Sequence, residues 1–360
     1  MKYLFALFLI PFALSFSFAQ EVFPFIDNME YLKSFQNGKE RQVDYLRPID
    51  LKYSEEIIAY IDNKSDFFIY DGQSKERMTG LANDYKIGIN IAAWNTGPIV
   101  SVWDNGRQHV LTQFGGRYEI SDSLVVFEDR RDNAIRVYYN DSIYDLFYSV
   151  TDLSFPTAIG SNSVAFVGNG DVHYSFISGK TVEIGVINDP VNYKAGGNII
   201  AFNDPFNQTF AITMQNEILD VENITVNDYK AGYDLVVYRD RNENLKGYID
   251  YKLVTLSNYS AQFYDVFRDV IVWGENGIFY TYMNGKKYEI CNYIPQEYKI
   301  RNGIVAFRNM NGGVSVFYNE QVKIISNLSG ASFEVNGNTV RIQVNKGNFL
   351  FFKNGRTYQH

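Results

Sequence analysis

The sequence is poor in cysteine and histidine. A single cysteine, Cys291, in 360 residues excludes a fold held together by disulfide bonds within the chain. The three histidines, His109, His173 and His360, lie far apart, so a histidine-based metal site or catalytic triad would need distant partners. The motifs His-Glu-x-x-His and Gly-x-Ser-x-Gly are absent. The sequence therefore indicates no catalytic residue and no cofactor, and we lean towards a protein that is not an enzyme.

The chain also lacks an excess of basic residues. It has 33 Lys and Arg against 41 Asp and Glu, so its formal net charge is −8, which disfavours a nucleic-acid-binding surface. Contents of 46% hydrophobic and 21% charged residues are typical of a folded chain with a large core. No long segment has the period of an amphipathic helix. These features predict a folded protein built mainly from strands.

Long hydrophobic runs are missing except at the N-terminus. Residues 1–19 are apolar apart from Lys2 and end in Ser17-Phe18-Ala19, which places small residues at a cleavage site before Gln20. The run is shorter than the roughly 20 residues of a transmembrane helix. We expect a cleaved signal peptide and a mature chain, 20–360, that is periplasmic or extracellular and has no membrane span; a retained anchor is the alternative. Because residue 20 is not cysteine, no lipoprotein anchor is expected.

What the sequence does contain is one unit repeated ten times. A clear copy is Gly303-Ile-Val-Ala-Phe307, and its last residue, here called the anchor, recurs at intervals of 33 to 39 residues. The anchors are Phe25, Tyr60, Trp94, Phe127, Phe166, Phe202, Tyr238, Trp273, Phe307 and Ile342.

A second position follows the same period. Nine residues before the anchor, seven of nine units have an aromatic residue, and Leu51 and Thr157 are the exceptions. The seven are Tyr85, Tyr118, Tyr193, Tyr229, Tyr264, Tyr298 and Phe333. The unit that starts at Tyr298 predicts four short strands, 298–300, 304–307, 314–318 and 322–325, from its β-branched and aromatic residues.

The turn between the third and fourth strands has its own signature. Asn-Gly is a strong hairpin signal because both residues tolerate positive φ. It occurs there at Asn37-Gly38, Asn105-Gly106, Asn284-Gly285 and Asn354-Gly355, and Asp71-Gly72 and Ser178-Gly179 take the same place in other units.

Four antiparallel strands every 35 residues predict an all-β protein, a β-propeller of about ten four-stranded units. A charged first strand, an Ile-Ala-Phe second strand, an Asn or Asp turn and a Tyr-rich third strand resemble the repeats of TolB-type and WD40-type β-propellers over nearly the whole mature chain. The Asp-box and the Gly-His to Trp-Asp signature of such repeats are absent, and Trp103-Asp104 is a single dipeptide. The resemblance implies a platform that binds other molecules, since enzymes are a minority among such propellers.

The number of rings stays open at this point. Ten units form either one large ring or two five-bladed rings, 20–190 and 191–360, and an open array is a third possibility. We expect one ring, because no linker rich in Pro, Gly or Ser separates two halves. The first unit begins at Glu21 and lacks a first strand, whose anchor would fall at Phe16 in the signal peptide.

The repeat provides an internal control for functional residues, because a residue shared by its sibling units is expected to be structural. Cys291 aligns with Ser257 and Ser326, each followed by Asn, and is predicted to be a small side chain at a strand end. Six acids two residues after the anchor are predicted to cap turns. They are Asp27, Asp62, Asp129, Asp204, Asp240 and Glu275.

One of these acids suggests a metal. Asp240, Asn242 and Asn244 have the alternating oxygen spacing of a calcium loop, but the glycine and the distal Glu of such a loop are missing. Turn capping is the preferred interpretation, and these three residues are weak metal candidates.

Charged residues follow the aromatic position in eight units. They are Lys52, Lys86, Glu119, Lys194, Lys230, Asp265, Lys299 and Glu334. On innermost strands they would line the central channel and are candidates for holding a ligand. The preferred alternative is that they prevent wrong pairing of an edge strand.

Aromatic residues outside the repeat give a further set of candidates. Tyr138-Tyr139, Phe279 to Tyr282 and Phe349 to Phe352 are rings that would suit a sugar or a protein partner if exposed. Alternation on third strands explains them equally well. Tyr138 and Tyr280 are the weak ligand candidates. The longest unit, Phe127 to Phe166, is the expected place of a functional loop.

These observations predict a non-enzymatic protein of the bacterial cell envelope or extracellular space that uses a rigid propeller as a scaffold for another protein. A glycan-binding or carbohydrate-active propeller is the alternative.

Overall fold

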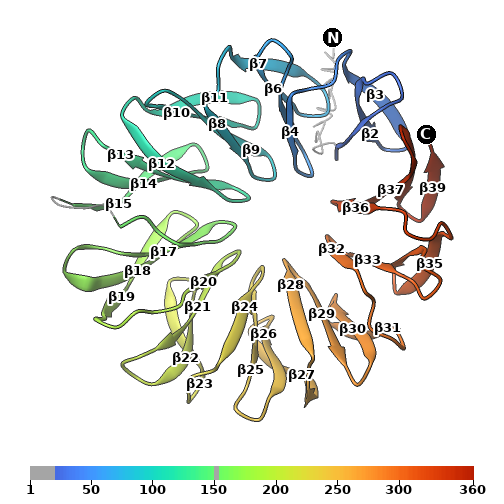
Figure 1. The fold of residues 1–360 in the computed structure, drawn as a ribbon. Coiled ribbons are helices and arrows are strands. Elements are labelled where there is room, and N and C mark those ends of the chain that lie inside the picture. The colour runs from blue at the N-terminus through green and yellow to red at the C-terminus, as the bar shows by residue number, and fades with distance from the viewer. Residues whose placement is uncertain (1–20, 150–153) are drawn as a thin grey trace, which may run out of the picture.

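The computed structural model describes residues 21–149 and 154–360, and the predicted signal peptide lies outside these residues. The described residues form ten antiparallel sheets arranged around one central channel (Figure 1). The first sheet has three strands and the other nine have four, and we call these sheets blades 1 to 10 in chain order. One ring is therefore present rather than two, and the ten predicted units are its ten blades.

The strands occupy four positions from the channel to the rim. The innermost strands are β4 (Asp50–Tyr53), β8 (Asp84–Ile87), β12 (Gly115–Ile120), β16 (Ala158–Ile159), β20 (Lys194–Ala195), β24 (Asp228–Ala231), β28 (Phe263–Phe267), β32 (Tyr298–Arg301) and β36 (Phe333–Asn336). The second strands are β1 (Phe23–Ile26), β5 (Ile58–Ile61), β9 (Ile91–Thr96), β13 (Leu124–Asp129), β17 (Ser163–Val167), β21 (Ile199–Asp204), β25 (Leu235–Arg239), β29 (Val270–Glu275), β33 (Ile304–Arg308) and β37 (Thr339–Asn345).

The third and fourth strands complete each blade. The third strands are β2 (Leu32–Gln36), β6 (Phe67–Tyr70), β10 (Ile99–Asp104), β14 (Ala134–Tyr139), β18 (Val172–Ile177), β22 (Thr209–Met214), β26 (Asn244–Ile249), β30 (Ile278–Met283), β34 (Val314–Tyr318) and β38 (Asn348–Lys353). The outermost strands are β3 (Lys39–Asp44), β7 (Lys75–Thr79), β11 (Arg107–Thr112), β15 (Ser142–Tyr148), β19 (Lys180–Val186), β23 (Glu217–Glu222), β27 (Lys252–Ser260), β31 (Lys286–Cys291), β35 (Gln321–Ser326) and β39 (Arg356–Gln359). One short 3₁₀ turn, η1 (Asn169–Asp171), is the only helical element among the described residues, none of which form a helix of sufficient length and hydrophobicity to cross a membrane.

The two repeat positions of the sequence are cross-strand neighbours. Each anchor lies on a second strand, and the aromatic residue nine positions earlier lies opposite it, as in the pair Tyr85 and Trp94 or the pair Tyr264 and Trp273. The turns at Asn105-Gly106 and Asn284-Gly285 have positive φ at both residues, as the hairpin signature predicts. The repeat is thus the register of one four-stranded sheet.

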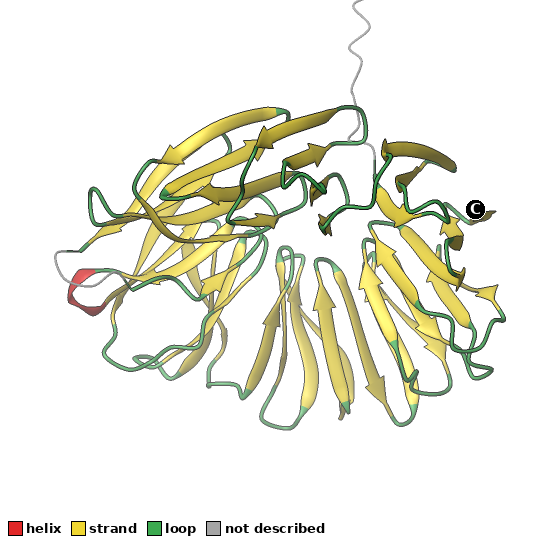
Figure 2. Ribbon diagram, turned by 45° about the horizontal axis from the view of Figure 1, so that its top comes forward, coloured by secondary structure: helices red, strands yellow, loops and turns green. Residues whose placement is uncertain are grey.

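The hydrophobic core lies between blades. Each of the ten interfaces between neighbouring blades holds one cluster of buried apolar side chains among the described residues. Anchors such as Trp94, Phe127 and Trp273 are completely or almost completely buried there. Because a blade buries its faces only against its neighbours, the ring is held together as a closed series of interfaces (Figure 2).

The ring closes between blades 1 and 10 through phenylalanine. Phe23, Phe25 and Phe35 of blade 1 pack against Phe349 and Phe351 of blade 10, and the rings of Phe35 and Phe351 stack 4.2 Å apart. Of the two interpretations of residues 349–352, exposed rings are excluded at Phe349, Phe351 and Phe352, which are buried.

Side chains replace the innermost strand that blade 1 lacks. The free edge of β1 has Pro24, which has no backbone N–H to leave unpaired. Asn336 Nδ2 donates to the Val22 carbonyl at 2.7 Å, and the Arg341 guanidinium donates to the Pro24 carbonyl. The Val22 N–H donates to the Glu55 carbonyl of blade 2 at 2.8 Å. Polar groups along this edge are therefore satisfied without a fourth strand.

Candidate functional site

Most of the charged residues of the innermost strands join neighbouring blades. Lys52 Nζ donates to the Tyr85 carbonyl at 2.6 Å and lies 4.2 Å from the centre of the Tyr85 ring. Lys86 and Lys230 make the same pair of contacts with the aromatic residue of the next blade, and Lys299 repeats them on Phe333. These lysines link neighbouring blades by a hydrogen bond and a cation–π contact, a role that neither of the two sequence-based interpretations included.

The acidic members of this set are also paired. Glu119 accepts a hydrogen bond from Lys86, and Asp265 accepts one from Lys230. Glu334 pairs with Arg341 and also accepts from the Tyr53 hydroxyl. Lys194 is the exception, because it is exposed and makes no such contact with the residues that the structure describes. It is the one inner-strand candidate whose charge stays available to a ligand.

The two tyrosine candidates differ in exposure. Tyr138 is only 2% exposed, and its hydroxyl lies 3.1 Å from both Asp104 Oδ2 and Asp141 Oδ1. Tyr138 therefore does not present the exposed ring that its role as a ligand candidate requires. Tyr280 is half-buried, stacks on Trp273 and lies beneath the Lys287 ammonium group. The loop of the longest unit lies partly outside the described residues, at 150–153.

Asp240 caps its turn as predicted. Its Oδ1 atom accepts from the backbone N–H groups of Asn242 at 2.8 Å and of Asn244 at 3.0 Å. Its Oδ2 atom accepts from Asn244 Nδ2 and pairs with Lys246. The carboxylate oxygens that a calcium ion would need are thus already bound within the protein, and no group of three metal-ligating side chains occurs in residues 21–149 and 154–360.

Cys291 makes the same kind of hydrogen bond as the serine at the corresponding position of another blade. Its Sγ atom donates to the Tyr293 carbonyl at 3.3 Å, just as Ser257 Oγ donates to the Tyr259 carbonyl at 3.2 Å. Burial raises the pKa of the Cys291 thiol, which keeps it protonated and weakly nucleophilic. The structural role predicted from the repeat fits this geometry.

We expect the Cys291→Ser variant to keep its free energy of unfolding within about 0.5 kcal/mol of the wild-type value, since the hydroxyl can make the same hydrogen bond. Urea unfolding followed by tryptophan fluorescence measures this difference. Alkylation of Cys291 by iodoacetamide should be slow in the folded protein and fast in urea. Rapid alkylation of the folded protein would contradict the structural assignment.

His173 is buried between blades 5 and 6. Its Nδ1 atom lies 2.8 Å from the Tyr193 hydroxyl and its Nε2 atom lies 3.0 Å from the Ile187 carbonyl. Burial lowers the pKa of the His173 imidazole, because a charged ring loses its hydration there. The ring packs between blades and is not grouped with any nucleophile.

This lowered pKa predicts a dependence of stability on pH. Above about pH 6.5, the ordinary histidine pKa, the imidazole is neutral in both states and contributes no slope. Below it the unfolded chain binds a proton that the folded protein takes up less readily, so the free energy of unfolding falls with decreasing pH. The His173→Gln variant should lose part of this slope in urea titrations at a series of pH values. The variant Gln108→Ala, at an exposed position of β11 that does not titrate, is the control and should keep it.

A different set of residues gathers at one mouth of the channel. The turns between the first and second strands surround the centre of the ring (Figure 1). Five residues before the anchor, the residue type varies from blade to blade, and only glycine occurs twice. These residues are Glu55, Ile89, Asp122, Ser161, Gly197, Tyr233, Arg268, Asn302 and Gly337.

The turns are joined by backbone hydrogen bonds, and we call this ring of contacts the collar. Its N–H donors and carbonyl acceptors, on successive blades, are Val22 to Glu55, Ile89 to Asp122, Ser123 to Ser161, Ser161 to Gly196, Gly197 to Gly232 and Tyr233 to Arg268, at 2.8–3.2 Å. Asn336 of blade 10 adds to it by donating to the carbonyls of Val22 and Ser54. The collar fixes the turns that carry the non-repeating side chains.

Glycine makes this close approach possible. Gly88, Gly160, Gly196 and Gly232 all lie six residues before their anchors. A Cβ atom at Gly196 would lie 2.1 Å from the Gly232 carbonyl oxygen, and one at Gly232 would lie 2.1 Å from the Arg268 carbonyl oxygen. No larger residue fits there without separating the turns.

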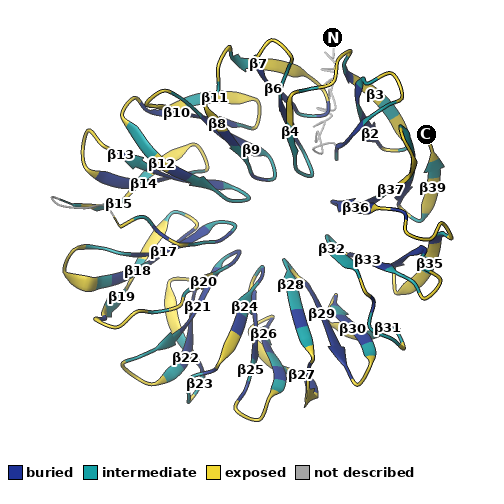
Figure 3. Cartoon of the chain, viewed as in Figure 1, coloured by how far each residue is buried: buried dark blue, intermediate teal, exposed yellow. Residues whose placement is uncertain are grey.

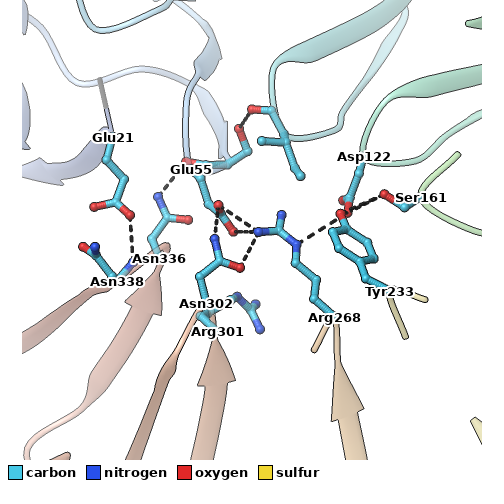
Figure 4. Close-up of polar contacts among 12 residues, drawn as sticks. Glu21, Glu55, Asp122, Ser161, Tyr233, Arg268, Arg301, Asn302, Asn336 and Asn338 are labelled. Atoms are coloured by element: carbon cyan, nitrogen blue, oxygen red, sulfur yellow. Dashed lines mark hydrogen bonds and ion pairs between the residues drawn. The ribbon is translucent and has the colours of Figure 1, made fainter. Parts of the chain in front are cut away.

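A side-chain network crosses the channel mouth within the collar (Figure 4). Arg268 of blade 8 forms an ion pair with Glu55 of blade 2, with Nη1 2.9 Å from Oε1. Asn302 of blade 9 donates to Glu55 Oε2 at 2.6 Å and accepts from Arg268. Burial lowers the pKa of the Arg268 guanidinium, but the charge and hydrogen bond of Glu55, together with the charges of Tyr233 and Asp122, outweigh it, so the net shift is upward.

A second part of the network lies on the other side of Arg268. The carboxylate of Asp122 accepts from the Tyr233 hydroxyl and from Ser161 Oγ at 3.0 Å. Burial and the hydrogen bond to Asp122 raise the pKa of Tyr233 to about 12. The Arg268 guanidinium lies 5.3 Å from the centre of the Tyr233 ring. Side chains from blades 2, 4, 5, 7, 8 and 9 thus meet across the channel.

Sequence reasoning did not single out this network. The signal was nevertheless present, because these residues share one position in the repeat and differ in type from unit to unit.

These ten radial blades around a single channel define the protein as a ten-bladed β-propeller. Residues 16–358 match the family model of the 10-bladed beta propeller domain, and the chain belongs to that family. No curated protein matches the chain significantly.

Several solved structures are similar over part of the ring. The computationally designed Ika8 protein is 15% identical, with a TM-score of 0.35, 74% of this chain covered and 95% of that one. The CRINKLY WD40 ectodomain of the Arabidopsis thaliana receptor kinase ACR4 is 10% identical, with a TM-score of 0.30, 66% of this chain covered and 94% of that one. Kluyveromyces lactis Hsv2p is 10% identical, with a TM-score of 0.30, 65% of this chain covered and 92% of that one. These similarities are too distant to add anything about function.

Proposed function

We propose that this protein is a non-enzymatic binding protein of the bacterial cell envelope or extracellular space, whose rigid ring is a platform for another protein. The proposed location rests on the sequence of residues 1–19, which has the pattern of a cleaved signal peptide. N-terminal sequencing of the protein from fractionated cells should find a chain that begins at Gln20 in the periplasm or the medium. An intact N-terminus in the cytoplasm would contradict this.

Exposed apolar side chains along half of the rim are the observation that carries the binding role. The outermost strands of blades 3 to 7 each present at least one, and we call this set the rim surface. It consists of Val110, Ile143, Val186, Ile218 and Leu253. Their exposed fractions range from 40% to 64%, and the outermost strands are largely exposed (Figure 3).

The rim surface is not a general property of the outermost strands. Those of blades 1, 2, 8 and 10 contain no large apolar side chain that is exposed to this degree, and they present mostly charged and polar residues such as Lys75 and Arg356. Blade 9 presents Val322 and Ile324 on β35, at 45% and 63% exposure, but blade 8 separates it from the rim surface. Apolar side chains that continue over consecutive elements mark interaction surfaces more often than isolated ones do. The repeat does not require them, which favours a partner that contacts several blades at once.

Site-specific photo-crosslinking in the native host tests this role. A photoreactive amino acid at Val186 or Leu253 should give one discrete crosslinked protein, identified by mass spectrometry. The same amino acid at Thr357 of β39 in blade 10 is the matched control and should give none. Equal labelling at all three positions, or none at any, would contradict the rim surface as the platform.

A separate experiment tests the alternative of glycan binding. A glycan array with the purified protein should be negative if the rim binds a protein. Saturable sugar binding that is lost in Tyr280→Ala would favour the carbohydrate alternative, because Tyr280 is the more accessible of the two tyrosine candidates.

A further inference from the structure

A cavity of about 360 Å³ adjoins the network at the channel mouth. Residues of six blades line it, so it belongs to the channel and to no single blade. Its charged lining consists of Glu55, Asp122, Arg268 and Arg301. This volume lies in the range of small-molecule sites.

The four charges are not equally paired. Arg268 is bound to Glu55, and Asp122 accepts hydrogen bonds from Tyr233 and Ser161. Arg301 forms no ion pair with any carboxylate of residues 21–149 and 154–360, and the hydrogen bond from its Nη1 to the Ile300 carbonyl is at 2.8 Å. Figure 4 shows its guanidinium apart from the dashed contacts. The four charges of the lining sum to zero, but both carboxylates lie beside Arg268, which leaves Arg301 without an ion pair among the described residues.

Two further observations concern the guanidinium groups of Arg268 and Arg301. The Nε–H of Arg268 is buried and has no hydrogen-bond acceptor among the described residues, since Asp122 Oδ2 is 3.8 Å away. Burial lowers the pKa of the Arg301 guanidinium, and the attraction of Glu55 does not restore it. A half-buried cation without an ion pair costs free energy, which an anion beside Arg301 would recover.

The opposite wall of the cavity is apolar. Ile87, Ile89 and Ile120 line it from blades 3 and 4, and all three are half-buried. Ile89 stands where most other blades have a polar residue or glycine. Phe267 supports the Arg301 guanidinium, which lies 4.6 Å from the centre of its ring. A ligand that fits must join a compact anion to an apolar body.

We propose that this cavity binds a small carboxylate with an apolar body. The carboxylate accepts from the Arg301 guanidinium, and the apolar part lies against Ile87, Ile89 and Ile120. The planar guanidinium of Arg301 matches the two oxygens of a carboxylate. Binding of such a molecule involves the channel and not the rim, so this proposal stands or falls independently of the partner protein.

The test uses the purified mature chain and isothermal titration calorimetry. The probes are isovalerate and phenylacetate, each compared with its neutral amide. We expect at least one acid to bind saturably and at least about tenfold more tightly than its amide. If neither acid binds more tightly than its amide, the proposal is wrong.

Variants at Arg301 locate the site. Arg301→Gln should weaken binding of the acid at least about tenfold, and Arg301→Lys should weaken it less, because a lysine keeps the charge but not the paired donors. The matched control is Arg107→Gln on the exposed strand β11, which should bind like the wild type. Unchanged binding in Arg301→Gln would overturn the proposal. If Arg301→Gln does not fold, the comparison of acid and amide in the wild type still decides.

Discussion

The Gly232→Ala variant is expected to lose about 3 kcal/mol of unfolding free energy, at the upper end of the usual cost of overpacking. The added Cβ would lie 2.1 Å from the Arg268 carbonyl oxygen, which accepts the collar hydrogen bond of Tyr233. A backbone oxygen held on both sides cannot move aside as a flexible side chain can. Urea unfolding monitored by tryptophan fluorescence measures the loss.

Gly80→Ala is the matched control. The nearest atom to its added Cβ would be the Arg77 guanidinium at 2.9 Å, the mobile end of an exposed side chain. We expect this variant to remain within about 0.5 kcal/mol of the wild type. If Gly232→Ala were equally stable, the turns could separate freely and the collar would not hold the channel mouth.

Removing Glu21 is expected to open the ring. Glu21 lies at the start of blade 1 and pairs with Lys353 of blade 10, whose residue exposure is only 5%. It also accepts from the Asn338 N–H at 2.7 Å and from Thr339 Oγ1 at 3.1 Å. Glu21→Ala leaves the Lys353 ammonium buried and unpaired, which should cost about 3–5 kcal/mol. Urea unfolding and limited proteolysis measure the effect.

The order of the related variants is the sharper test. Lys353→Met removes the buried charge itself and leaves Glu21 with its two remaining donors, so it should cost less than Glu21→Ala. The double variant Glu21→Gln with Lys353→Met should be more stable than Glu21→Ala alone, because no charge is left buried without a partner. Additive losses would show that the pair contributes nothing specific to closure.

The sequence predicted the blades because one physical requirement recurs ten times. An anchor such as Trp273 must be buried against the next blade, and Tyr264 must lie opposite it on the innermost strand. The buried anchor and the aromatic residue opposite it therefore recur with a regular period in the amino-acid sequence. The repeat also predicts that the unit beginning at Glu21 lacks a first strand, and the sheet of blade 1 has three strands.

The channel mouth could not be predicted equally well, because its contacts depend on closure. Glu55 and Arg268 are 213 positions apart, and only the ring brings their turns together. The charge of Lys52 was visible, but its acceptor is a backbone carbonyl of the next blade, which no side-chain pattern reveals. Exposure of Tyr138 depended on Asp104 of the preceding blade, which holds its hydroxyl inside.

Closure by side chains also has a consequence for how the chain reaches its native state. Nine of the ten interfaces join blades that are adjacent in sequence, so they can form locally and spread along the chain. The interface of blades 1 and 10 is different, because Glu21 and Lys353 are 332 positions apart. Contacts of such separation form late, after the entropy of the intervening chain has been reduced. The all-phenylalanine cluster and the Glu21 pair should therefore act chiefly on the rate of unfolding, and the last kinetic step of folding should be the joining of the two ends.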